Sequence, residues 1–163
     1  MVIGSSFGSS LLPTPYSLLP TPEDSVHLTR RYWFSASHRL HRAALPEGEN
    51  RELYGKCNNP GGHGHNYFLE VTVAGPIDPR TGMTVNLSEL DAYVEARVVE
   101  PFHESSLNEQ PQFGDLVPTT ENLCVEIYRV LNAGWDRLES ARRARLERVR
   151  LEETSSNFFE YRG

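Results

Sequence analysis

The residues best suited to chemistry in this 163-residue chain are three histidines on two predicted strands. His63 and His65 are separated by one residue, and side chains at i and i+2 of a strand point to the same side, ~6.6–6.8 Å apart. His38 ends the preceding predicted strand, so antiparallel pairing brings it beside the other two. Three imidazoles without an evident fourth ligand are typical of a catalytic zinc site with one open position. The sequence therefore predicts a zinc centre at these histidines.

Cys57 lies in the same stretch, six residues before His63 and joined to it by the flexible segment "NNPGG". Two roles are open for its thiol. It could be a fourth metal ligand that closes a structural site, or a thiolate beside the metal that acts as base or nucleophile, because a nearby cation favours the ionised form. Cys124 falls in the apolar stripe of a predicted helix, which indicates packing.

The elements that position these residues follow from hydrophobic periodicity. Residues 26–40 and 63–75 are rich in β-branched and aromatic residues and predict two strands. One face of the second strand carries residues of a single parity: His65, Tyr67, Leu69, Val71 and Val73. Residues 41–62 predict a long loop, and residues 83–87 predict a third strand.

Two helices are predicted next. Ser88 and Asp91 have the spacing of a capping box and begin an amphipathic helix that Pro101 ends. The second helix, within residues 118–134, ends at its glycine and is capped by one of two threonines, Thr119 or Thr120.

A hairpin of residues 145–154 and 157–163 closes the chain. The resulting order, β-β-β-α-α-β-β, predicts one α+β domain at residues 26–163 with an antiparallel sheet. Residues 1–25 contain "SLLPTP" twice and many Ser and Pro residues, which predicts a disordered tail.

Composition narrows the class of protein. The formal net charge is −6, which argues against nucleic-acid binding. No apolar run approaches the ~20 residues of a membrane helix, and the first residues lack the basic and apolar regions of a secretory signal. Two cysteines do not form a disulfide framework. We therefore expect a cytoplasmic protein that binds neither nucleic acid nor membrane.

Five sequence blocks together resemble the 6-pyruvoyl-tetrahydropterin synthases and the related queuosine-pathway 6-carboxy-tetrahydropterin synthases. The blocks span about residues 30–163 and read "FSASHRL", "YGKCNNPGGHGHNY", "GMTVNL", "PTTENL" and "EET". The resemblance implies the tunnelling fold (T-fold), an antiparallel sheet with two helices on one face. It also implies a homo-oligomer, in which trimers join their sheets into a barrel and stack into hexamers, with sites between subunits. The implied substrate is 7,8-dihydroneopterin triphosphate, which loses triphosphate while its side chain rearranges.

The resemblance also implies roles for matching residues. The zinc ligands would be His38, His63 and His65, and Cys57, as thiolate, would be the general base. Glu153 would anchor the pterin ring, with Glu152 as the alternative because strand alternation lets only one of them face the pocket. Further pocket residues would be Thr119, Thr120 and Glu121, although helix capping and a first-turn charge are sufficient explanations for the last two.

The segment after the first predicted helix departs from the family pattern. Related proteins carry an Asp-His pair that orients and relays protons, whereas this chain reads "PFHESSLNE". Aligned without a gap, His103 replaces the aspartate and Glu104 the histidine; with a one-residue slip, His103 remains and Phe102 replaces the aspartate. We expect His103 to relay protons, with Glu104 as its orienting partner.

Three functions therefore remain open. The first is a zinc-dependent lyase that forms 6-pyruvoyl-tetrahydropterin. The second is the queuosine-type synthase, which yields 6-carboxy-tetrahydropterin and acetaldehyde from the same substrate, and the altered segment at His103 and Glu104 keeps it open. The third is an oligomer that binds zinc and pterin without turnover. The five residues between Cys57 and His63 resemble the pyruvoyl-forming branch.

Overall fold

Two long antiparallel strands, β1 (Ser25–His38) and β2 (His63–Pro76), form the centre of the sheet in the computed structural model, which describes residues 24–163. β4 (Arg145–Thr154) and β5 (Asn157–Tyr161) continue the sheet beyond β2. β3 (Ser105–Ser106) pairs with the other edge of β1, which gives the order β3-β1-β2-β4-β5. The tail predicted at residues 1–25 lies outside the described residues, except for its last two, and Ser25 already belongs to β1.

The sheet was predicted to be antiparallel, but one of its pairings is parallel. Ala36 and Ser37 of β1 pair with Ser105 and Ser106 of β3 in parallel, whereas the other three pairings are antiparallel. The closing hairpin of β4 and β5 is confirmed. The sheet stays open in a single chain, so a barrel would require further copies.

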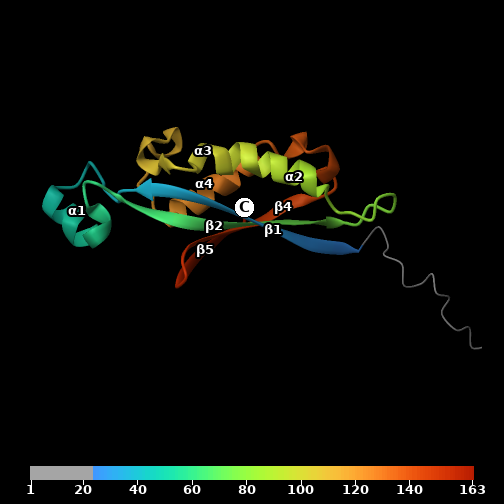
Figure 1. The fold of residues 1–163 in the computed structure, drawn as a ribbon, viewed down its shortest axis with the longest axis horizontal. Helices are drawn as coiled ribbons and strands as arrows, with labels where there is room; N and C mark the ends of the chain where they lie inside the picture. The colour runs from blue at the N-terminus through green and yellow to red at the C-terminus, as the bar shows by residue number, and fades with distance from the viewer. Residues whose placement is uncertain (1–23) are drawn as a thin grey trace, which may run out of the picture.

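Helices cover one face of the sheet (Figure 1). The first run consists of α2 (Leu87–Val94), a π-helical turn (Glu95–Val99) and α3 (Glu100–Phe102), and the second is α4 (Thr120–Asn132). The face of β2 that was predicted to be apolar is buried against these helices, and its core residues are Tyr67, Leu69, Val71 and Val73. Burial of each aliphatic side chain among them contributes about 1.5–3 kcal/mol to the free energy of folding. The predicted α+β fold with two helical runs on one face is therefore confirmed.

One of the two predicted caps of α4 is correct, whereas the predicted cap of α2 is wrong. Thr119 caps α4, with its hydroxyl accepting from the Asn122 N–H at 3.3 Å. Asn86, not Ser88, caps α2: the Asn86 side chain accepts from the Ser88 N–H at 2.9 Å. The cap therefore lies two residues earlier than predicted, because the side-chain oxygen of Asn86 accepts from the free N–H groups of the first turn.

Pro101 was predicted to end the first helical run, and this prediction is wrong. The Glu100 N–H bonds to the Glu95 carbonyl across the π turn. A π turn is wider than an α turn, so it relieves the contact between the proline ring and the carbonyl four residues earlier. The chain stays helical to Phe102.

Two segments predicted from composition have a different structure. Residues 83–87 form no strand, and Leu87 already belongs to α2. The predicted loop at 41–62 contains α1 (Glu47–Tyr54) and a 3-10 turn (Gly55–Asn58). The remaining short 3-10 turns are Leu107–Glu109, Pro111–Phe113, Trp135–Arg137 and Glu139–Ala141.

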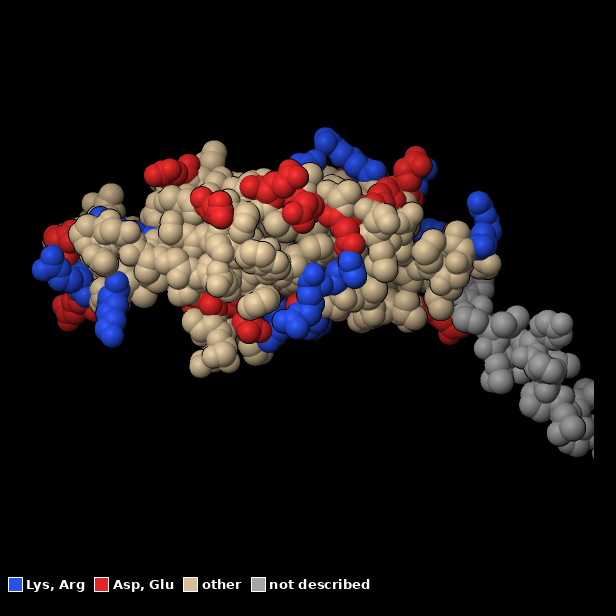
Figure 2. Space-filling model, in the orientation of Figure 1, with Lys and Arg blue, Asp and Glu red and all other residues tan. Residues whose placement is uncertain are grey.

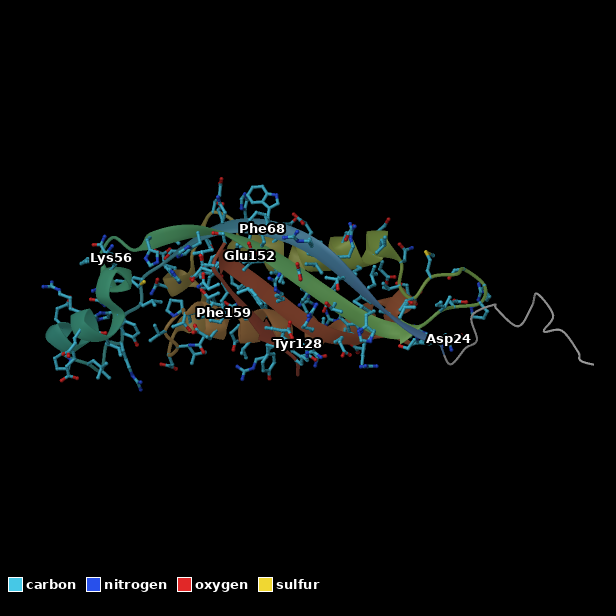
Figure 3. All side chains as sticks on the ribbon, turned by 90° about the horizontal axis from the view of Figure 1, so that it is seen from below. Asp24, Lys56, Phe68, Tyr128, Glu152 and Phe159 are labelled. Carbon is cyan, nitrogen blue, oxygen red and sulfur yellow. The ribbon has the colours of Figure 1, made fainter. Side chains whose placement is uncertain are left out.

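The other face of the sheet is not covered by helices (Figure 3). Exposed aromatic residues lie on it, including Trp33 and Phe68, which pair across β1 and β2. Phe68 is also paired with Glu152 of β4, and both are labelled near the middle of the sheet in Figure 3. On the face drawn in Figure 2, acidic side chains gather over the helical layer. Within residues 24–163, no helix has the length and apolar character to cross a membrane.

Candidate active site

The three predicted metal ligands meet at one end of the sheet. His38 is the last residue of β1 and pairs with His63, the first residue of β2, while His65 follows on the same side. One ring nitrogen from each lies within 4.8 Å of the other two. The antiparallel pairing of β1 and β2 thus creates a three-histidine cluster that could hold a metal ion.

The hydrogen bond of His38 fixes which of its nitrogens faces the cluster. Its Nδ1 lies 2.7 Å from the carbonyl oxygen of Pro118, which can only accept, so Nδ1 carries the proton. The lone pair of Nε2 then points into the cluster. This nitrogen lies 3.1 Å from Nε2 of His63. Ligands on a tetrahedral zinc with bonds of ~2.0–2.1 Å are about 3.4 Å apart, so these two nitrogens are close to the required spacing.

Two other ring nitrogens in the cluster have no partner. Nδ1 of His63 and Nε2 of His65 are buried without a hydrogen bond to any described residue. A buried polar atom left unpaired costs about 1–3 kcal/mol. Burial also lowers the pKa of His38 and of His65, which favours the neutral form that binds metal. The donor set and its electrostatics therefore fit a metal ion.

Glu153 is the carboxylate that faces the cluster. It is the extra residue of a bulge in β4, because Glu152 pairs with Phe158 and Thr154 pairs with Asn157. Oε1 of Glu153 lies 3.6 Å from Nε2 of His65. Glu152 instead lies 3.8 Å from Arg150. Of the two candidates, the structure brings Glu153 to the histidines.

Two neighbours hold the Glu153 carboxylate. The hydroxyl of Thr120 donates to Oε1, and the amide of Asn157 donates to Oε2 at 2.8 Å. Burial raises the pKa of Glu153, but these hydrogen bonds and the nearby His65 and His38 outweigh it, so the pKa is below its ordinary value. The carboxylate is therefore ionised and fixed in orientation at neutral pH.

The remaining candidate residues are not members of the histidine cluster. Cys57 is a free, half-buried cysteine in the 3-10 turn, and its carbonyl accepts from the Leu40 N–H at 2.8 Å. Among the described residues, the group able to hold a metal contains only the three histidines. Thr119 caps α4, and Glu121 is exposed in its first turn.

His103 and Glu104 lie at the outer edge of β1. The Ser35 N–H donates to Nδ1 of His103 at 3.1 Å, and the Glu104 N–H donates to the Ser35 carbonyl at 2.7 Å. The His103 ring packs edge-on against Trp33. The Glu104 side chain is 83% exposed, and its φ of 55° is in the left-handed region, which is costly for a residue with Cβ. The hydrogen bonds of this pair are therefore made to the edge of the sheet and not to the three histidines.

Three features of the site were not predicted from the sequence. The carbonyl of Pro118 orients His38, and Asn157 orients Glu153. The hydroxyl of Tyr67 is buried close to Thr120 and Glu153, and burial raises its pKa. Pro118 lies in the quoted block "PTTENL", but a backbone carbonyl has no signature in the sequence.

Comparison with known proteins assigns the family. A family model described as 6-pyruvoyl tetrahydropterin synthase matches residues 27–163. The chain belongs to this family. It is 47% identical over 146 residues to a 6-pyruvoyl tetrahydrobiopterin synthase of Poecilia reticulata, covering 88% of this chain and 95% of that one. It is 45% identical over 140 residues to the Homo sapiens protein of the same name, covering 85% and 92%.

The fold agrees with the family assignment. A solved structure of Caenorhabditis elegans 6-pyruvoyl tetrahydropterin synthase superimposes with a TM-score of 0.77 at 34% identity, covering 90% of this chain and 99% of the other. The 6-pyruvoyl tetrahydropterin synthase match includes nearly all of β1 and every later strand, and therefore every residue of the histidine cluster.

Proposed function

We propose that this chain is a zinc-dependent lyase that converts 7,8-dihydroneopterin triphosphate to 6-pyruvoyl-tetrahydropterin with loss of triphosphate, in tetrahydrobiopterin biosynthesis. The observation that carries the proposal is the three-histidine cluster with unpaired ring nitrogens next to an ionised, fixed carboxylate, Glu153. Family membership and the names of its relatives support it.

Zinc is the metal that the donor set favours. His38, His63 and His65 supply neutral imidazoles, which suit zinc, and the cluster contains no thiol or carboxylate member. When bound there, zinc supplies Lewis-acid chemistry: it polarises the side-chain hydroxyls of the substrate and makes the neighbouring C–H more acidic.

Glu153 binds the pterin ring in this proposal. An ionised carboxylate can accept two parallel hydrogen bonds from the aminopyrimidine edge of a pterin, as it does from a guanidinium group. Thr120 and Asn157 keep its two oxygens in place before the ring arrives, which lowers the entropic cost of binding. Thr119 and Glu121 flank Thr120 at the start of α4 and contact the same ring in this proposal.

Cys57 and His103 move protons in this proposal. Cys57, a free thiol on the segment that precedes the histidines, removes the substrate proton as thiolate. His103 relays protons through Nε2, because its Nδ1 accepts from the Ser35 N–H and leaves Nε2 as the neutral ring's donor. Glu104, whose Oε1 lies 4.0 Å from that Nε2, orients the imidazole.

The position of this pair favours a homo-oligomer, either a trimer or a hexamer. His103 and Glu104 bond to outward-facing backbone groups of Ser35 at the sheet edge, and no hydrogen bond joins either of them to the histidine cluster within the described residues. β5 forms the opposite edge, and open edges are sites where further strands pair. A neighbouring copy at such an edge would bring one subunit's His103 to another subunit's cluster.

The test is product analysis with zinc-loaded protein. We expect incubation with 7,8-dihydroneopterin triphosphate to release triphosphate and a pyruvoyl-pterin, identified by mass. Cys57→Ala should reduce turnover by about 10²–10⁴-fold because it removes the general base. Cys124→Ala is the matched control and should retain activity, because Cys124 is buried in the helix–sheet core.

Two other results of this experiment would indicate the two other functions. A carboxy-pterin with acetaldehyde would assign the chain to the queuosine-type reaction, and the altered segment at His103 and Glu104 is the feature that favours this alternative. Bound zinc and pterin without turnover would leave a binding oligomer.

A further inference from the structure

The chain that follows His38 is held in place by polar side chains. Within residues 39–62, the only fully buried side chains are two asparagines, Asn50 and Asn58. Asn50 accepts from the Arg42 N–H at 2.7 Å and donates to the Arg42 carbonyl at 2.9 Å. Both backbone groups of Arg42 are thereby fixed by one side chain that is itself buried.

Two more asparagines fix the preceding residues. Asn108 accepts from the Arg39 N–H at 2.7 Å and donates to the Arg39 carbonyl at 2.9 Å. Asn58 donates to the Leu40 carbonyl at 2.8 Å. Residues 39–42 are therefore held in one conformation by side-chain amides, without the buried apolar side chains that fix the rest of the fold.

This arrangement fixes the tautomer of His41. The nitrogen of the Asn58 amide faces the Leu40 carbonyl, which can only accept, so that end of the amide is the donor. The same nitrogen lies 3.0 Å from Nδ1 of His41, which must then accept. In the neutral ring the proton is therefore on Nε2, and His41 presents an N–H donor on its free side.

Arg42 is a cation without a counter-ion. Its guanidinium makes no ion pair or hydrogen bond with any other described residue, and the side chain is exposed. Arg39 differs, because its Nε donates to the Asn58 carbonyl at 2.9 Å and its guanidinium lies 3.6 Å from Glu47. The fixed backbone thus presents one free arginine and one imidazole donor.

Both groups line a cleft of about 830 Å³ that His38 also lines. Its walls come from the asparagine-held segment, from Gly61 and Gly62, and from the loop that ends at Pro118. Two exposed carboxylates, Glu109 and Asp115, line it as well. Figure 2 shows basic and acidic side chains close together at the end of the molecule formed by α1. Because the charges nearly balance, anion binding here depends on directed hydrogen bonds and not on overall charge.

We propose that this cleft is a polyphosphate subsite, in which Arg42 and His41 bind the triphosphate of the substrate. The inference rests on the proposed function, which requires a triphosphate close to the metal. The fork of an arginine matches phosphate oxygens in pairs, and the Nε2–H of His41 donates to a further oxygen. The arginines of the closing hairpin are less suitable, because Arg148 and Arg150 are paired with Glu160 and Glu70.

Binding of inorganic triphosphate tests the subsite directly. Isothermal titration is carried out on the full chain, with the metal bound and again after its removal by a chelator. In both states, Arg42→Ala should weaken binding about 10- to 100-fold, as expected for charge-assisted hydrogen bonds. His41→Ala should weaken it about fivefold. Arg51→Ala is the matched control, since Arg51 is an exposed arginine of α1 that does not line the cleft.

The outcomes separate the subsite from the proposed function. Arg42-dependent binding of inorganic triphosphate supports the subsite even if the pterin triphosphate is not converted, in which case the proposed function fails alone. Equal effects of Arg42→Ala and Arg51→Ala would overturn the subsite. Triphosphate binding that is lost when the metal is removed and is unchanged by Arg42→Ala would also overturn the subsite. If the pterin triphosphate is converted with the same KM by Arg42→Ala and the unmodified chain, the function stands and the subsite is wrong.

Discussion

The helix-covered middle of the sheet and its histidine end are built from different interactions. In the middle, alternate residues of β2 and one stripe of α4 bury apolar side chains, such as Leu69 and Leu123, with no exposed surface. At the histidine end, the buried residues include His38 and Asn50, which are held by hydrogen bonds. The middle supplies the free energy of folding, whereas the histidine end fixes polar groups in positions that serve binding.

The largest expected effect is on the free energy of unfolding. It is tested by replacing one leucine with alanine in each of the two regions. Leu123→Ala should lower the free energy of unfolding by about 2–5 kcal/mol, because it leaves a cavity in the core. Leu53→Ala, on α1 beside the histidine end, should change it by less than about 0.5 kcal/mol, because that side chain is 63% exposed. Urea unfolding of the metal-free protein at one fixed concentration measures both.

A loss from Leu53→Ala comparable to that from Leu123→Ala would break the comparison. It would mean that α1 packs against something that contributes to folding, such as a neighbouring subunit. Repeating the measurement at several protein concentrations would identify that case, because the stability of an oligomer depends on concentration.

The second prediction concerns pH and the histidine end. Burial lowers the pKa of His38 and of His65 in the folded state, so the unfolded chain binds more protons as pH falls through its histidine pKa of ~6.5. The associated stability is complete above that pH and is lost as pH falls toward the lowered pKa values. Metal-free protein should therefore show a falling Tm below about pH 6.5.

His65→Ala isolates the part of this slope that comes from the cluster. Its Tm should fall less between pH 7 and pH 5 than that of the unmodified chain, and His27→Ala is the matched control because His27 is exposed on β1. Identical slopes for His65→Ala and the unmodified chain would show that the cluster does not titrate with folding.

The smallest effect should separate the two cysteines, one from each region. Burial raises the pKa of Cys124 to about 12, so it remains a thiol and should not react with iodoacetamide at neutral pH. Cys57, half-buried at the histidine end, should be labelled first. Mass spectrometry of the partly labelled native protein measures the order, and labelling of Cys124 before Cys57 would contradict it.

The parts of the fold that the sequence predicts best are those with a local cause. The alternation along β2 placed Tyr67, Leu69 and Val71 on one buried face, because strand side chains alternate. Thr119 was named as one of two possible caps of α4, because its hydroxyl can reach a free N–H of the first turn. The meeting of His38 with His63 also followed, since it required only that two consecutive strands pair.

The features that the sequence did not predict depend on distant partners. Residues 83–87 have a strand-like composition, but no strand within residues 24–163 pairs with them, and Leu87 already belongs to α2. α1 is fixed through Asn50, whose amide bonds to residues earlier in the chain. The carbonyl of Pro118 meets His38 only after the loop before α4 has folded onto the sheet. Polar contacts of this kind leave no periodic pattern in a sequence.

The most direct test of the account is the metal content of the purified full chain. We expect one zinc per chain by elemental analysis, and loss of that zinc in His63→Ala, because the site needs a ring nitrogen from each of the three histidines. Absence of stoichiometric zinc from the unmodified chain after expression with zinc, or its retention in His63→Ala, would contradict the assignment of the histidine end as a zinc site.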